Sequence, residues 1–160
     1  MTTVVIEELN KLVKGEKNMV SIPMKTNLFK EKMTSLKIVN TGNGQLLSTI
    51  NNFDFYPGSV SLVAFLDFFN LRPDTNYILS VSAHFPDGTN YPVHATRVNI
   101  AKQDFVLLDD GYGKATGNFD FSFTIQAPSD FLFLFVLLDE NGNEVDTAYS
   151  YHHFGLWEMI

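Results

Sequence analysis

Residues 59–85 of the chain are SVSLVAFLDFFNLRPDTNYILSVSAHF, two apolar runs joined by a short polar corner. In the first run every second position is apolar, as expected for a strand, whose successive side chains point to opposite faces. These positions are Val60, Leu62, Ala64, Leu66 and Phe68. The positions between them include Val63, Phe65 and Phe69, so we expect both faces of this strand to meet protein. The pattern predicts a strand at the centre of the fold.

Similar runs, separated by turn sequences, occupy most of the remaining chain. The clearest alternation lies at 119–126, and residues 131–138 are apolar on both faces, which predicts a second central strand. Asn141-Gly142 is typical of a hairpin turn. The other predicted strands are 35–40, 45–50, 77–84, 91–101, 105–108 and 145–157.

About eight to ten short strands with almost no helix are typical of an all-β antiparallel sandwich. We expect residues 35–160 to form this one domain. The glycine-rich stretch 109–117 predicts a loop, and a division there into two smaller sandwiches is the alternative.

The corner LRPDTNYILSV, residues 71–81, resembles the segment of fibronectin type III domains that enters their sixth strand. Leucine, proline, threonine, tyrosine and valine have matching spacing. The resemblance implies an immunoglobulin-like sandwich with a structural corner at Leu71, Pro73 and Tyr77, in which the Tyr77 hydroxyl bonds to backbone a few residues upstream. It implies no binding or catalytic residue. The chain departs from that family in having its only tryptophan, Trp157, near the end.

Residues 1–34 are predicted to form a separate N-terminal part, a short helix followed by a basic connection. The helical stripe consists of Val5, Leu9, Leu12 and Val13, followed by Gly15 as a stop. The β-branched run 4–6 leaves an edge strand as the alternative. We expect the helix to cover an open end of the core or to serve in docking or oligomerisation. The lysines of 25–37 are expected to be solvated, on a connection that lies against the acidic surface of the domain itself.

The formal net charge of -7 is unevenly distributed. Residues 1–37 hold seven lysines and four glutamates, a net charge of +3, and residues 38–160 hold four basic and fourteen acidic groups, a net charge of -10. The acidic body argues against nucleic acid as a partner.

Cysteine is absent, which excludes disulfides and cysteine-based metal, redox or nucleophilic sites. The first 17 residues lack the features of a secretory signal, and no apolar run is long enough to span a bilayer. We therefore expect no membrane partner and a cytoplasmic location.

Metal and catalytic sites are not predicted. The histidines are His84, His94, His152 and His153, and the last two would point to opposite faces of one strand. The acidic stretches 109–113 and 139–146 offer oxygen ligands for calcium, but the second lacks the glycine of an EF-hand loop and is explained by a hairpin turn. No nucleophile elbow surrounds Ser59, and no glycine-rich loop has phosphate-binding spacing. We expect no cofactor, no metal, no catalytic residue and no enzyme activity.

Aromatic residues are the remaining candidates for a binding site, although most are expected to fill the core. The candidate partner-binding residues are Phe55, Tyr56, Tyr112, Tyr149, Tyr151 and Trp157. The sequence thus predicts a non-catalytic protein-interaction or structural accessory protein that binds another protein or itself as a homo-oligomer. The alternative is a carbohydrate-binding module that stacks these rings on sugar. The chain is also similar in general look to accessory proteins of phages and prophages, which implies a virion component.

Overall fold

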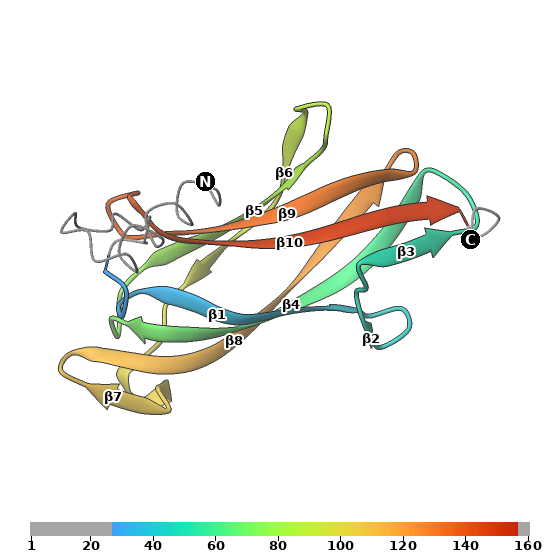
Figure 1. Ribbon diagram of the computed structural model, residues 1–160. Coiled ribbons are helices and arrows are strands. Elements are labelled where there is room, and N and C mark those ends of the chain that lie inside the picture. Colours follow the sequence, from blue (N-terminus) through green and yellow to red (C-terminus); the bar gives the residue numbers. More distant parts are fainter. Residues whose placement is uncertain (1–26, 157–160) are drawn as a thin grey trace, which may run out of the picture.

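The computed structural model describes residues 27–156 as two five-stranded sheets packed as a sandwich (Figure 1). The first sheet has the order β2-β1-β4-β8-β7 and the second the order β3-β10-β9-β5-β6. The strands of the first sheet are β1 (Lys32–Asn40), β2 (Gln45–Leu46), β4 (Gly58–Leu71), β7 (Leu107–Asp109) and β8 (Tyr112–Ile125). Those of the second are β3 (Ile50–Phe53), β5 (Tyr77–His84), β6 (Asn90–Val98), β9 (Ser129–Leu138) and β10 (Glu144–Leu156).

Neighbouring strands are antiparallel except β3 and β10, which run parallel. The predicted all-β sandwich is confirmed. The predicted N-terminal helix falls on residues that lie outside the described part of the chain. Within residues 27–156, no helix is long and apolar enough to cross a membrane.

β4 and β9 are the middle strands of their sheets, as the two apolar runs predicted. Their alternate residues point into the core, which both sheets share. The expectation that both faces of β4 meet protein is wrong, because Phe65 on its outward face is 43% exposed. No second layer covers this face among the described residues, and neighbouring β8 presents polar side chains there, such as Asn118 and Ser122.

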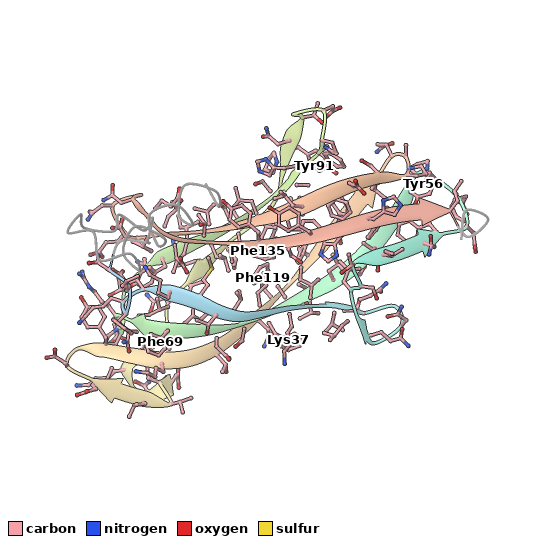
Figure 2. The ribbon with its side chains drawn as sticks, in the orientation of Figure 1. Lys37, Tyr56, Phe69, Tyr91, Phe119 and Phe135 are labelled. Carbon is pink, nitrogen blue, oxygen red and sulfur yellow. The ribbon has the colours of Figure 1, made fainter. Side chains whose placement is uncertain are left out.

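The core is an array of phenylalanine rings contributed by both sheets. Phe121 and Phe133 meet edge to face with centroids 5.5 Å apart, and Phe123 and Phe131 lie 4.8 Å apart. Such edge-to-face contacts add to the free energy of burial. Figure 2 shows Phe119 and Phe135 between the two sheets. Most of the phenylalanines are therefore accounted for by packing.

The corner between β4 and β5 is closed by Tyr77. Its buried hydroxyl accepts a hydrogen bond from the backbone N–H of Arg72 at 3.0 Å. Leu71 and Tyr77 are both almost fully buried, and Pro73 lies between them on the turn. This is the contact that the resemblance to the fibronectin corner implied for Tyr77.

The predicted loop at 109–117 is largely strand. β7 and β8 form a hairpin whose turn is Asp110-Gly111, both with positive φ. Gly113 and Gly117 lie inside β8, where a side chain would collide with the rings of Phe105 and Phe68. The glycines of this stretch predicted a loop, whereas in the structure they provide space for aromatic packing.

The first strands of the sandwich, β1 and β2, differ from the predicted ones in their bounds and contacts. β1 begins at Lys32, three residues before the predicted start at residue 35, and Lys32 is buried instead of solvated. Its Nζ donates to the carbonyl oxygen of Val145, and the carboxylate of Asp146 accepts a 2.7 Å hydrogen bond from Met33 N–H. These contacts join the start of β1 to β10 in the other sheet. The predicted return strand 45–50 is only the two residues of β2, after which the chain crosses to the second sheet as β3.

Candidate binding surface

The outward side of the second sheet is apolar across three adjacent strands. The pairing register places Leu134 between Tyr149 of β10 and Ser82 of β5, and Leu138 beside Ile78. We call this surface the outer face. It consists of Ile78, Leu132, Leu134, Val136, Leu138, Tyr149 and Tyr151.

Two tyrosines are the most exposed residues of the outer face. Tyr149 is 57% and Tyr151 66% exposed, and their rings lie nearly parallel with centroids 6.4 Å apart. Ile78 is 46% exposed, and the four aliphatic residues of β9 are half-buried. A sandwich sheet that faces water normally carries polar residues on its outward side. The outer face therefore has the composition of a surface that another molecule covers.

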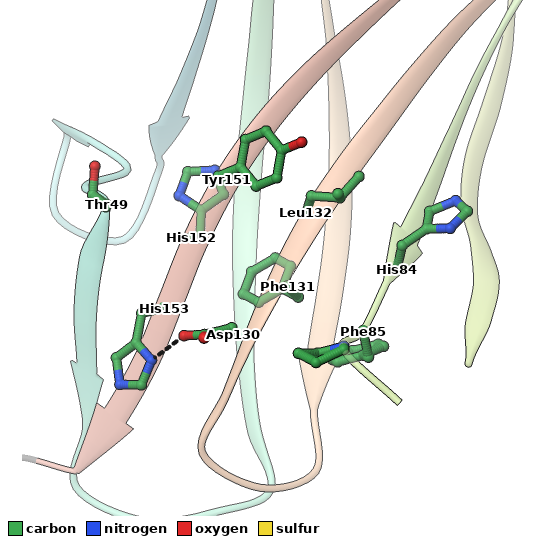
Figure 3. A pocket seen from close by; sticks show the side chains of 10 residues that line it. Thr49, His84, Phe85, Asp130, Phe131, Leu132, Tyr151, His152 and His153 are labelled. Atoms are coloured by element: carbon green, nitrogen blue, oxygen red, sulfur yellow. Dashed lines mark hydrogen bonds and ion pairs between the residues drawn. The ribbon is translucent and has the colours of Figure 1, made fainter. Parts of the chain in front are cut away.

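A depression lies at the end of the outer face where β9 begins, with a volume of about 380 Å³. We call it the end pocket (Figure 3). Its walls are Thr49, His84, Phe85, Pro86, Asp130, Phe131, Leu132, Tyr151, His152 and His153. Tyr151 and Leu132 belong to both the pocket and the outer face. The two features therefore form one continuous surface.

The polar groups of the end pocket are fixed by hydrogen bonds. His153 Nδ1 lies 2.6 Å from Asp130 Oδ1, across strands β10 and β9 (Figure 3). His84 Nε2 lies 2.8 Å from the hydroxyl of Ser82. Among the described residues that line the pocket, Asp130 is the sole carboxylate and there is no lysine or arginine. The pocket thus has apolar walls and a weakly acidic rim.

His152 points into the sandwich, on the opposite side of β10 from His153. Its Nδ1 donates to the carbonyl oxygen of Ser48 at 2.7 Å, and its Nε2 lies 2.6 Å from the hydroxyl of Ser150. Burial lowers the pKa of His152 below its usual value, and the bond to Ser48 opposes this shift. His152 therefore holds the loop before β3 against β10.

An aspartate and a histidine on one pocket wall also occur in acyl-transfer sites, where the imidazole activates a hydroxyl or thiol. Here the Asp130–His153 pair is largely exposed, and no hydroxyl among the described residues is hydrogen bonded to His153 Nε2. Within residues 27–156, no three histidine or carboxylate side chains are placed to hold a metal ion. The chemistry that the pocket offers is apolar contact and hydrogen bonding.

The six predicted partner-binding residues are not all brought together. Tyr149 and Tyr151 share the outer face, whereas Phe55 is exposed in the β3–β4 loop. Tyr56 is half-buried, and its hydroxyl donates to the carbonyl oxygen of Gly155. Tyr112 lies at the opposite end of the sandwich, beneath the Lys30 ammonium at 3.6 Å from the ring centroid. Trp157 lies outside the described residues.

In the acidic stretch 139–146, Asp139 stabilises the hairpin turn by hydrogen bonds within the turn. The Asp139 carboxylate accepts hydrogen bonds from the backbone N–H groups of Asn141 and Asn143, both at 2.9 Å. These bonds, chiefly the one from Asn143, lower the pKa of Asp139. Asp146 points away from this turn and binds Met33.

Sequence reasoning missed Ile78, Asp130 and the β9 aliphatic residues as parts of a surface. The apolar outward positions of 132–138 were visible, but they were interpreted only as evidence of a central strand. The period-two pattern cannot show whether the second face of a central strand is covered by its own chain or left open. Asp130 became a site residue only through its pairing with His153 of β10.

No family model and no curated protein matches the chain. Among solved structures it is similar to a cross-linked bacterial adhesin from Mobiluncus mulieris, with 9% identity, a TM-score of 0.46, and coverage of 76% of this chain and 49% of the adhesin. It is also similar to a CARDB domain from Pyrococcus furiosus solved with di-metal ions, with 10% identity, a TM-score of 0.46, and coverage of 82% and 99%.

A Bacteroides uniformis β-glucuronidase has 15% identity and a TM-score of 0.41, and the match covers 74% of this chain but 13% of the enzyme. This chain thus spans about half the length of the adhesin and a small part of the glucuronidase. At these identities and TM-scores each likeness is one of general β architecture. The ligands and activities of those proteins are not transferred to this chain.

Proposed function

We propose that this protein is a non-catalytic interaction domain that binds a protein partner through the outer face. The observation that carries the proposal is the contrast between the two sheets. The outward side of the first sheet is mostly polar, whereas the outer face joins seven apolar side chains over β5, β9 and β10. Contiguous apolar surface with exposed tyrosines is typical of protein interfaces.

The central part of the outer face carries no charge. Its neighbours in the register are Ser80, Ser82 and Thr147. Among the described residues, charged groups appear at its corners, as Arg97, Asp130 and Glu144, the last of which pairs with Leu138. A partner can therefore cover this face without desolvating an unpaired charge, which would cost several kcal/mol. The proposed partner surface is accordingly apolar.

Carbohydrate binding is a second candidate, favoured by one observation. Tyr149 and Tyr151 present two nearly parallel rings beside a pocket that contains Asp130 and His153. Aromatic faces stack on the apolar faces of sugar rings, and carboxylate and imidazole groups bind hydroxyls. A glycan array with the intact protein tests this candidate, and binding that disappears in Tyr151→Ala would support it over a protein partner.

Site-specific photo-crosslinking tests the proposed function. A photoreactive phenylalanine analogue is placed at Tyr149, and in a matched control at Ser122, which is exposed on the outward side of the first sheet. We expect ultraviolet light applied to expressing cells to produce a protein adduct from position 149 and none from position 122. Equal yields at the two positions, or no adduct at position 149, would contradict the proposal.

A further inference from the structure

The turn that leads into β1 presents an aromatic side chain to solvent. Phe29 is 70% exposed, although large apolar side chains are usually buried. Its backbone is held in place, because Phe29 O accepts a 2.7 Å hydrogen bond from the Asn70 side chain and Glu31 N–H donates to Asn70 O at 2.9 Å. The adjacent Lys30 ammonium rests on the ring of Tyr112. Phe29 is thus an ordered apolar projection, which we call the knob.

The knob and the end pocket lie at opposite ends of the sandwich. The knob adjoins the start of β1, which contacts the start of β10, whereas the pocket lies where β9 begins and β10 ends. The ten residues of β9 separate these ends by about 30 Å, at about 3.3 Å per residue. Because the turn is tied to Asn70, Phe29 cannot enter the pocket of its own chain.

We propose that the end pocket accepts Phe29 of a second copy of this chain, so that molecules associate head to tail. This inference rests on the proposed function, because the end pocket is continuous with the outer face, and it names a second copy of the chain as the partner at that end. The pocket volume of about 380 Å³ lies within the usual range for sites that enclose a small ligand, and its walls are mainly apolar. A single aromatic anchor in such a pocket commonly supplies much of the free energy of binding at an interface.

Two further observations favour a second copy as the occupant. The backbone that carries the knob is already held in the free molecule, so insertion needs to order little more than the Phe29 side chain. The knob also belongs to the N-terminal part of the chain, residues 1–37, which has a net charge of +3, whereas Asp130 is the only carboxylate among the described residues that line the pocket. Knob and pocket are different surfaces, so the contact is heterologous and its repetition gives an open chain of molecules, or a ring if the rotation closes.

The test uses sedimentation velocity of the full chain over a range of concentrations. Two variants remove one half of the contact each, Phe29→Asp for the knob and Tyr151→Asp for the pocket. Two matched controls alter exposed residues nearby: Val106→Asp at the knob end, and Ile50→Asp on strand β3, at the pocket end but outside both the pocket and the outer face. All four positions are exposed, and circular dichroism checks that each variant folds.

We expect the wild-type protein and both controls to increase in mass with concentration. Each of the two variants should weaken association by about 30-fold or more, the usual effect of losing an aromatic anchor. Mixing Phe29→Asp with Tyr151→Asp should restore association but stop at a dimer, because one intact pocket then meets one intact knob.

A wild-type protein that stays monomeric up to its solubility limit would overturn this inference, and so would a mixture that forms no dimer. Neither result bears on crosslinking from Tyr149, which would still identify a different protein partner. Loss of association in Ile50→Asp but not in Tyr151→Asp would place the contact outside the pocket and would also overturn the inference.

Discussion

Tyr77 is the residue that closes the corner on which both sheets depend. Its hydroxyl is the hydrogen-bond acceptor of Arg72 N–H, and burial raises its pKa far above the usual value for tyrosine. The hydroxyl therefore stays neutral over the working range of pH. Its role is structural, and the residue is remote from the outer face.

Replacing Tyr77 by phenylalanine tests this role. Tyr77→Phe keeps the buried ring but leaves Arg72 N–H without its acceptor, which should cost about 1–3 kcal/mol of unfolding free energy. Urea denaturation measures the change. The control Tyr149→Phe removes an exposed hydroxyl and should change stability by less than about 0.5 kcal/mol. Equal effects of the two substitutions would show that the corner bond does not contribute.

His152 should make stability depend on pH. Burial lowers its folded-state pKa, so its contribution is complete above the unfolded value of about 6.5 and is lost as the pH falls through the folded pKa. His152→Gln removes this group, and its unfolding free energy should fall less than that of the wild type between about pH 7.5 and about pH 5. Urea denaturation at several pH values measures both curves. Parallel curves would contradict this assignment.

At the scale of elements, β4 and β9 show what the sequence could and could not predict. Their continuous apolar runs correctly predicted two central strands, because only a strand with neighbours on both sides buries so many alternate residues. The first run also wrongly predicted that both faces of β4 meet protein. In β4 the outward face exposes Phe65, and in β9 it contributes the aliphatic part of the outer face.

Register explains why the candidate site could not be predicted in full. Tyr149 and Tyr151 were candidates from sequence. Residues two positions apart in a strand point to the same side of the sheet. Their neighbours on the outer face come from strands β9 and β5, which are paired by the fold and not by sequence order. The β7–β8 hairpin was missed for a different reason, since Gly113 and Gly117 fit rings of the core instead of marking a loop.

The two faces of the second sheet should respond differently from each other to truncation. Phe133 lies on the inner side of β9 and is fully buried among other rings, so Phe133→Ala should cost about 3–5 kcal/mol. Phe65→Ala, on the outward side of β4, is the matched control and should cost much less. Urea denaturation of both variants provides the comparison. A similar loss at both positions would mean that the outward side of β4 is covered.

At the scale of the whole molecule, the charged groups are arranged around an uncharged surface. The net charge of -7 makes copies of the chain repel one another where their charged residues approach. The described residues at the centre of the outer face carry no charge. The pocket and the knob lie at opposite ends of this body. We therefore propose that the aromatic core stabilises this sandwich and that one side of one sheet binds a partner.

Hydroxyl-radical footprinting inside expressing cells tests directly whether a partner covers the outer face. Labelling of Tyr149 and Tyr151 is compared with labelling of Phe65, which is also exposed but lies on the outward side of the first sheet. Dilute purified protein supplies the reference. We expect both tyrosines to lose labelling in cells while Phe65 keeps its labelling. Unchanged labelling of the tyrosines, or protection of Phe65 alone, would contradict it.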